Sequence, residues 1–405
     1  MRTQLADFIK DTPEGKEAEE IVRRCVHCGF CTATCPTYQL LGDELDGPRG
    51  RIYLMKQVLE GVEPTRRTQL HLDRCLTCRA CETTCPSGVQ YGRLVDIGRD
   101  IVEKKIERPF GEQVARSALK HGLTSKLFGP AMRAGQAVRS FLPESIRSKV
   151  PERRDPGAWP QRSHARKMLL PLGCVQPSMS PGIDAATARV LDALEIEAIT
   201  PAASCCGAIK HHLNDHDAAL AEVRRNIDAW WPHVEAGVEA IVMNASGCGA
   251  MVKEYAHLLR HDRAYVEKAQ RIVALTKDLA ELLPQHAAVL TSKLREKAPE
   301  RVVFHPPCTL QHGQKIRGVV EQLLSAFGAE VLPLSESHLC CGSAGTYSVL
   351  QPELSKQLRD RKLEALHASQ PDVILSANIG CITHLANGAQ VPVRHWIEWL
   401  DARLS

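Results

Sequence analysis

Cysteine is the residue type with the greatest capacity for chemistry in this sequence, and the sixteen cysteines form two regularly spaced families. The first family repeats after 50 residues: Cys25, Cys28, Cys31 and Cys35, then Cys75, Cys78, Cys81 and Cys85. The second repeats after 133 to 135 residues: Cys174, Cys205, Cys206 and Cys248, then Cys308, Cys340, Cys341 and Cys381. The chemistry open to these thiols depends on the cellular compartment. Residues 1–11 include four charged residues and no apolar signal-peptide core, so we expect a cytoplasmic protein. Disulfides are disfavoured there, and the thiols therefore indicate metal or redox chemistry.

Both copies of the first family have the spacing C-x2-C-x2-C-x3-C-P, which is typical of 4Fe-4S clusters whose fourth ligand comes from the other motif. A residue before proline is pushed out of helical geometry, so the fourth cysteine can point away from its own motif. Zinc sites usually consist of two C-x2-C pairs and leave the third and fourth cysteines unexplained. The spacing predicts cluster one on Cys25, Cys28, Cys31 and Cys85, and cluster two on Cys75, Cys78, Cys81 and Cys35.

Apolar residues at helical spacing flank these motifs. Such runs occupy residues 18–25, 52–59 and 94–102, and the last ends before Pro109. We therefore predict an α-helical ferredoxin-like domain with two 4Fe-4S clusters over residues 1–110. Two clusters that exchange ligands must lie close together, which suits electron transfer.

Residues 111–167 are predicted to form a helical and basic linker. From 132 to 167 the sequence has nine Arg and Lys residues against three Asp and Glu, with four prolines. This segment suits a solvated connector, or a contact with an anionic membrane surface or an acidic partner.

The second cysteine family predicts a duplicated α/β Cys-Cys-Gly domain, with repeats at 168–270 and 300–405. Short apolar strands are expected at 168–172, 197–200 and 240–243, and again at 302–305, 330–332 and 373–376. Helices are expected after Asp184, as N-cap, and over 316–327, ending at Gly328. Alternating strands and helices predict a mostly parallel sheet, with the cysteines at the carboxyl ends of its strands.

The thiols of each repeat can converge, but the sequence leaves their ligand open. An iron-sulfur cluster, zinc, a redox-active vicinal thiol pair and inert buried cysteines all fit Cys174, Cys205, Cys206, Cys248, Cys308, Cys340, Cys341 and Cys381. We expect the nearby His211, His212, His338 and His384 to be surface or core residues and not ligands. Residues 342–345 are interpreted as a tight turn, since they lack a phosphate-loop pattern.

The composition excludes several function classes. A formal net charge of +4 over 405 residues gives no reason to expect nucleic-acid binding. No apolar run reaches the 18 residues of a membrane-spanning helix. The sequence has no flavin or nicotinamide fingerprint, so substrate oxidation is expected on a partner chain, and no residue here is expected to be catalytic.

The segment 25–51, the second cysteine motif and both Cys-Cys-Gly units closely resemble the iron-sulfur subunit of bacterial glycolate oxidase, also called glycolate dehydrogenase, over nearly the whole chain. The resemblance implies a subunit that assembles with FAD-binding subunits and carries no FAD itself. The complex would oxidise glycolate to glyoxylate, and D-lactate to pyruvate. Electrons would leave for a membrane-linked acceptor such as a quinone, which implies a peripheral position on the inner face of the cytoplasmic membrane.

Three other functions fit parts of the sequence. The corresponding subunit of an anaerobic glycerol-3-phosphate or lactate dehydrogenase would share the same domain order. Heterodisulfide-reductase-like thiol chemistry at the Cys-Cys-Gly sites is a second alternative, although Met251 and His384 replace the further cysteine of that enzyme. A zinc-stabilised assembly scaffold is the third.

Overall fold

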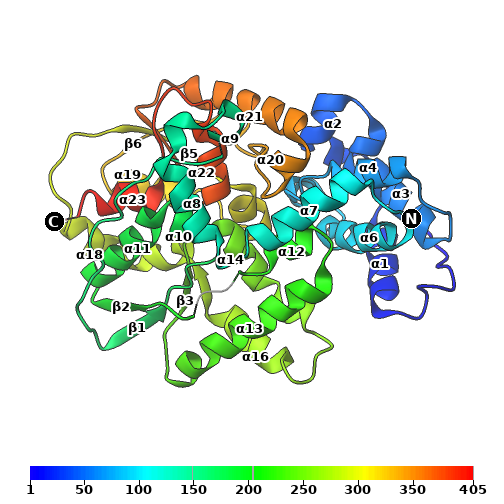
Figure 1. Ribbon diagram of the computed structural model, residues 1–405, viewed down its shortest axis with the longest axis horizontal. Helices are drawn as coiled ribbons and strands as arrows, with labels where there is room; N and C mark the ends of the chain where they lie inside the picture. Colours follow the sequence, from blue (N-terminus) through cyan, green and yellow to red (C-terminus); the bar gives the residue numbers. More distant parts are fainter. Residues whose placement is uncertain (148, 203–204, 405) are drawn as a thin grey trace.

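The computed structural model describes residues 1–147, 149–202 and 205–404, and it places an all-helical N-terminal part beside two α/β repeats (Figure 1). The N-terminal part lies at one end of the molecule, coloured blue to cyan. Its α-helices are α1 (Pro13–Arg24), α2 (Pro36–Leu41), α3 (Pro48–Leu59), α4 (Arg66–Asp73), α5 (Ala80–Thr84) and α6 (Tyr91–Lys105).

Three of these helices begin at a proline, and two of the three adjoin a cysteine of the first motif. Pro13, Pro36 and Pro48 occupy the first turn, where the missing N–H costs no hydrogen bond. Cys25 directly follows α1, and Cys35 directly precedes α2 in extended backbone. The thiols of the first motif therefore lie between α1 and α2, with Cys31 in the 3-10 helix η1 (Phe30–Thr32).

The N-terminal core forms where α3 crosses α6. A Cβ at Gly98 would lie 2.5 Å from Met55 Sδ, so glycine is needed for the two helices to approach this closely. The buried apolar residues around this crossing come from α1, α3 and α6 and include Ile21, Val22, Ile52, Met55, Leu94, Val95 and Val102. The helical character predicted for this domain is confirmed.

Helices also occupy much of the segment that follows: α7 (Phe110–Gly122), α8 (Phe128–Ala137) and α9 (Glu144–Arg147), with the 3-10 helix η3 (Arg139–Phe141). Phe110, Leu127 and Phe141 are all more than 70% exposed. Lys120 pairs with Asp215 at 3.0 Å, which ties the segment to the first repeat.

The first repeat is built on a four-stranded parallel sheet of order β2-β1-β3-β4. The strands are β1 (Arg166–Leu169), β2 (Ile196–Ile199), β3 (Ile241–Met243) and β4 (Thr276–Asp278). The helices are α10 (Gln176–Met179), α11 (Pro181–Ala193), α12 (Ala208–His212), α13 (His216–Glu235), α14 (Ser246–Lys253), α15 (Tyr255–Leu258), α16 (Val266–Leu275), α17 (Leu279–Leu282) and α18 (Ala287–Ser292), with the 3-10 helix η4 (Leu283–His286).

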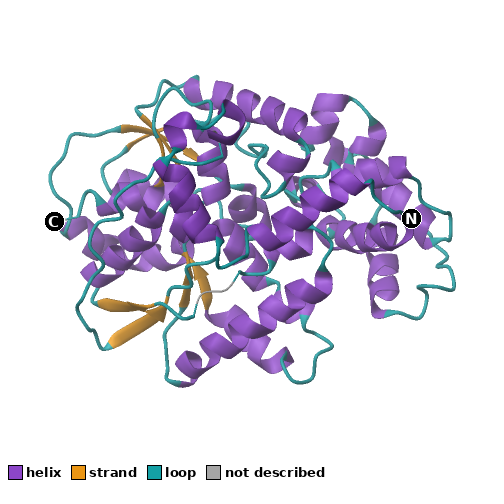
Figure 2. Ribbon diagram, in the orientation of Figure 1, coloured by secondary structure: helices purple, strands orange, loops and turns teal. Residues whose placement is uncertain are grey.

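The second repeat has the same strand order, β6-β5-β7-β8, again wholly parallel. Figure 2 shows how few strands there are among the surrounding helices. Its strands are β5 (Arg301–His305), β6 (Glu330–Leu332), β7 (Val373–Ser376) and β8 (Val393–His395). The π-helix η5 (Thr309–Gly313) is followed by α19 (Val319–Ala326), α20 (Tyr347–Leu350), α21 (Pro352–His367), α22 (Ile379–Ala386) and α23 (Trp396–Asp401). The predicted duplication of a parallel α/β domain is confirmed.

Some predicted boundaries were wrong. Strand β1 covers 166–169 and not 168–172, and α11 begins at Pro181 and not after Asp184. Asp184 is buried within that helix, where it accepts hydrogen bonds from Gln176 and Asn244 and does not cap it. Helix α19 begins only after Gly318, whose φ of +72° breaks the helical run predicted from 316. Strands β4 and β8 were not predicted.

The two repeats pack against each other. The Ser246 N–H donates to the Ala377 carbonyl at 3.0 Å, and Arg189 pairs with Asp401 at 2.7 Å between α11 and α23. One apolar core includes buried residues of both repeats. Among the described residues, none of the helices has the length and apolar character needed to cross a membrane.

Candidate metal and redox sites

The first thiol site is a cavity lined by Cys25, Cys28, Cys31 and Cys85, the four residues predicted for cluster one. Cys81 also reaches its wall. Burial and the neighbouring cysteines Cys25, Cys85 and Cys28 raise the pKa of Cys31 to about 11. Thiolates held this close need a cation between them, and a thiophilic metal supplies it.

The second thiol site is a cavity lined by Cys35, Cys75, Cys78 and Cys81, the four residues predicted for cluster two. Burial and nearby cysteines, including Cys75 and Cys35, raise the pKa of Cys78 and of Cys81. The two cavities share the walls formed by Pro48, Cys81 and Tyr91, so they are immediate neighbours. These two sets of donors fit two iron-sulfur clusters.

Left-handed backbone shapes both motifs in the same way. His27 and Gly29 have φ of +61° and +90°, and the equivalent Thr77 and Arg79 have +52° and +59°. Three of these residues carry a Cβ, for which positive φ is uncommon and costs free energy. In both copies the surrounding structure therefore holds the turn in an unfavourable backbone conformation, as expected where a chain wraps around a ligand.

Two buried arginines set the electrostatics of the second cavity. Burial alone would raise the pKa of Cys75, but Arg51 and Arg99 lower it below its usual value. Arg51 is 1% exposed, and its guanidinium donates to the His71 carbonyl at 2.7 Å and to Asp46 at 3.3 Å. Arg99 donates to the Cys75 carbonyl at 2.6 Å. The cations therefore favour the thiolate form that metal binding requires.

The first repeat brings its four predicted thiols together. Hydrogen bonds join Cys174 to Cys205, Cys205 to Cys206, and Cys206 to Cys248. The two bonds that Cys205 accepts, from Cys174 and from Cys206, lower its pKa. Cys174 lies in the loop after β1, and Cys248 lies in the first turn of α14, which follows β3, so both are beyond the carboxyl ends of strands.

The second repeat forms a similar chain of thiols. Cys308 Sγ lies 3.9 Å from Cys340 Sγ, Cys340 contacts Cys341, and Cys341 contacts Cys381. The vicinal cysteines of both repeats are at most 6% exposed. Such burial argues against a disulfide substrate reaching these sulfurs.

The thiols of the second repeat also adjoin the N-terminal part. Cys340 belongs to an apolar cluster with Leu76 and Tyr347, and Cys78 and Cys308 pack against it. Cys78 and Cys308 also line one large cavity of about 700 Å³ between the N-terminal helices and the repeats. The second N-terminal cavity and the second repeat are therefore in direct contact.

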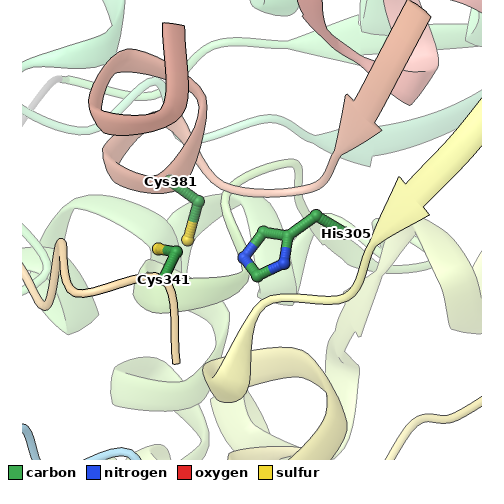
Figure 3. A group of neighbouring side chains, drawn as sticks. All are labelled: His305, Cys341 and Cys381. Carbon is green, nitrogen blue, oxygen red and sulfur yellow. The ribbon is translucent and has the colours of Figure 1, made fainter. Parts of the chain in front are cut away.

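One histidine in the second repeat was missed by the sequence reasoning. A ring nitrogen of His305 and the sulfurs of Cys341 and Cys381 all lie within 4.8 Å of one another (Figure 3). His305 ends β5, three residues before Cys308, and this position at a strand end was the available signal. Burial lowers the pKa of His305 well below its usual value, which keeps the ring neutral.

The histidines that were considered occupy other settings. His211 contacts Asp96 at 3.2 Å, and the buried His384 contacts Ser355 Oγ at 3.2 Å. Among the described residues, one other potential metal-binding group consists of Asp43, Asp46 and His71. Asp46 already forms ion pairs with Arg51 and Arg74, so its carboxylate is balanced by protein cations and needs no metal ion.

Comparison with known proteins agrees with this arrangement. The family described as "4Fe-4S dicluster domain" matches residues 21–89, and the "Cysteine-rich domain" family matches residues 169–253 and 302–386. The chain is thus an iron-sulfur protein that joins a 4Fe-4S dicluster domain to a duplicated cysteine-rich α/β domain.

Similarity to whole proteins defines the family. The "Glycolate oxidase iron-sulfur subunit" of Escherichia coli (strain K12) is 53% identical over 408 residues, covering 100% of this chain and 99% of the relative. The "Probable glycolate oxidase iron-sulfur subunit" of Bacillus subtilis (strain 168) is 33% identical and covers 90% and 88%. "Lactate utilization protein A" of Geobacillus thermodenitrificans (strain NG80-2) is 28% identical over 58% of this chain. The chain belongs to the family of glycolate oxidase iron-sulfur subunits.

Proposed function

We propose that this chain is the electron-transfer subunit of a flavin-dependent glycolate oxidase complex. The observation that carries the proposal is the pair of adjoining cavities, each lined by the four cysteines of one predicted cluster. Bound 4Fe-4S clusters would supply one-electron redox chemistry. Cys25, Cys28, Cys31 and Cys85 hold one cluster, and Cys75, Cys78, Cys81 and Cys35 hold the other.

The protein supplies position, burial and charge to these centres. Arg51 and Arg99 place two buried cations beside Cys75, which stabilises a more negative, reduced state of the second centre. The arginine beside the first centre, Arg49, is 33% exposed and pairs with Glu44, and Cys28 is exposed. The two centres therefore differ in potential and in access to solvent.

Electrons reach this chain at the exposed end of the relay. Val26 and Phe30, on either side of Cys28, are 68% and 62% exposed, although apolar side chains of this size are usually buried. This surface suits contact with an FAD-binding subunit that oxidises glycolate or D-lactate. The similarity to lactate utilization proteins supports a 2-hydroxy acid as substrate, and its identity is decided on the flavin subunit.

The electron acceptor of this chain is proposed to lie in the membrane. The exposed Phe110, Leu127 and Phe141 lie in and beside a segment rich in Arg and Lys. Exposed apolar and basic residues together suit an anionic lipid surface. We accordingly place the complex peripherally on the cytoplasmic face of the membrane, where electrons pass to a quinone or a similar acceptor.

A ligand substitution tests this division of labour. In the complex with Cys31→Ser, glycolate should still reduce the flavin of the partner, while transfer to the membrane acceptor should be lost. Stopped-flow flavin absorbance and acceptor reduction measure the two steps separately. Thr34→Ser, which keeps a hydroxyl in the same turn, is the matched control and should retain both steps. An assembled Cys31→Ser complex whose flavin is no longer reduced by glycolate would contradict the proposal.

The clusters themselves are tested by analysis of the anaerobically purified complex. Two cubane clusters require about eight irons with matching sulfide on this chain. Zinc without iron would remove the electron-transfer function and support a scaffold role.

A further inference from the structure

The buried side chain of His305 makes no hydrogen bond within the described part of the protein. It is 1% exposed, and neither of its ring nitrogens has a hydrogen-bond partner among the described residues. A buried polar group without a partner costs about 1–3 kcal/mol. Such a group in a folded protein needs an explanation, and a bound ligand is one.

The ring is directed at sulfur. Figure 3 shows the imidazole of His305, at the end of β5, facing the thiols of Cys341 and Cys381, which come from the loop after β6 and from α22. All three donor atoms lie within 4.8 Å of one another. Imidazole nitrogen and thiolate sulfur are the ligands preferred by zinc and by iron in sulfur-rich sites.

We propose that the second repeat binds a thiophilic transition-metal centre in which His305, Cys341 and Cys381 are ligands. Cys340 and Cys308 complete the donor set. Their sulfurs are 3.9 Å apart, close to the roughly 3.8 Å between two thiolates on one tetrahedral metal at a metal–sulfur distance of about 2.3 Å. Four thiols and one imidazole exceed the four ligands of a single tetrahedral ion, so an iron-sulfur centre with more than one metal fits best.

Other buried histidines in the same repeat show that His305 is unusual. His395 is also fully buried, but its Nδ1 accepts the Ile397 N–H and caps α23. His384 contacts the Ser355 hydroxyl. These rings have hydrogen-bond partners, whereas the ring of His305 has none among the described residues and faces the two thiols.

The proposal makes the two repeats chemically different. Pro171, three residues before Cys174, occupies the sequence position that corresponds to His305, three residues before Cys308. The first repeat therefore has the four thiols without the imidazole. The centre of the second repeat would also lie beside Cys78, and its role as an extension of the relay rests on the proposed function.

Metal content and nitrogen ligation test the proposal on the anaerobically purified full-length protein. Iron, zinc and sulfide are quantified in the wild type, in His305→Ala and in the control His384→Ala. His305→Ala should lose at least about one metal atom per chain, and the control should lose none. A loss of iron with sulfide identifies a cluster, and a loss of zinc identifies a single ion; both support the site. Unchanged metal content in a folded His305→Ala protein would overturn it.

A second measurement covers the case in which His305→Ala does not fold. His305→Cys retains a metal-binding side chain and should retain the metal, but it should lose the nitrogen coupling seen by pulsed electron paramagnetic resonance or, for zinc, by X-ray absorption. A nitrogen signal that persists in His305→Cys, or that is absent from the wild type, would overturn the assignment. Cys31→Ser separates the two proposals, because it should deplete the N-terminal clusters and leave the nitrogen signal intact.

Discussion

Alanine substitution of the two glycines that follow the cysteine pairs should destabilise the second repeat more than the first. Gly207 and Gly342 both have left-handed backbone, with φ of +93° and +87°. A Cβ at Gly207 would meet the Ala219 carbonyl oxygen at 3.3 Å. At Gly342 it would lie 2.5 Å from the Ser355 carbonyl oxygen and 2.9 Å from Leu358 Cβ.

These distances give different free-energy changes for the two variants. The left-handed backbone costs an L-residue about 1–2 kcal/mol at either position. Overpacking adds about 1–3 kcal/mol where the neighbour cannot move, and both neighbours of Gly342 belong to α21. We expect a loss of about 1–2 kcal/mol for Gly207→Ala and about 2–5 kcal/mol for Gly342→Ala.

Hydrogen exchange of the anaerobic full-length protein can assign each loss to its repeat. Amides of α21 should exchange faster in Gly342→Ala, by about tenfold for each 1.4 kcal/mol, while amides of α13 should change less. In Gly207→Ala the smaller effect should appear in α13, which contains Ala219. Equal losses in the two variants, or a larger loss for Gly207→Ala, would refute the argument from close packing.

Two further predictions concern buried charges. Arg51→Met removes a buried cation beside Cys75, so an anaerobic redox titration should give a more negative midpoint potential for the second N-terminal cluster. Arg74→Met, at a side chain that is 28% exposed, should shift it less, and an equal shift would count against this reasoning. Burial raises the pKa of Asp184 to about 6, above about 3.9 for an unfolded chain, so its contribution to stability decreases as pH rises through this range. Urea unfolding should show about 1 kcal/mol less stability at pH 8 than at pH 5.5 from this group, and Asp184→Asn should remove that difference.

Much of the fold follows from local sequence signals. The apolar spacing in 52–59 and 94–102 predicted α3 and α6, because a helix buries one face regardless of what covers it. Strands β6 and β7 matched their predictions because each is a short run bounded by turn residues. Strands β4 and β8 have three residues each and include exposed polar residues, so their existence depends on the neighbouring strand.

Some features of the candidate sites could likewise be predicted from local sequence, and others could not. The two cysteine families, the tight turn at 342–345 and the places of the later cysteines after strands could be predicted from the sequence, because each depends on residues only a few positions apart. The tertiary structure decided that His305 faces Cys341 and Cys381 and that Cys78 lies beside Cys308. These contacts join residues separated by 36 to 230 positions, and only the packing of whole elements brings such residues together.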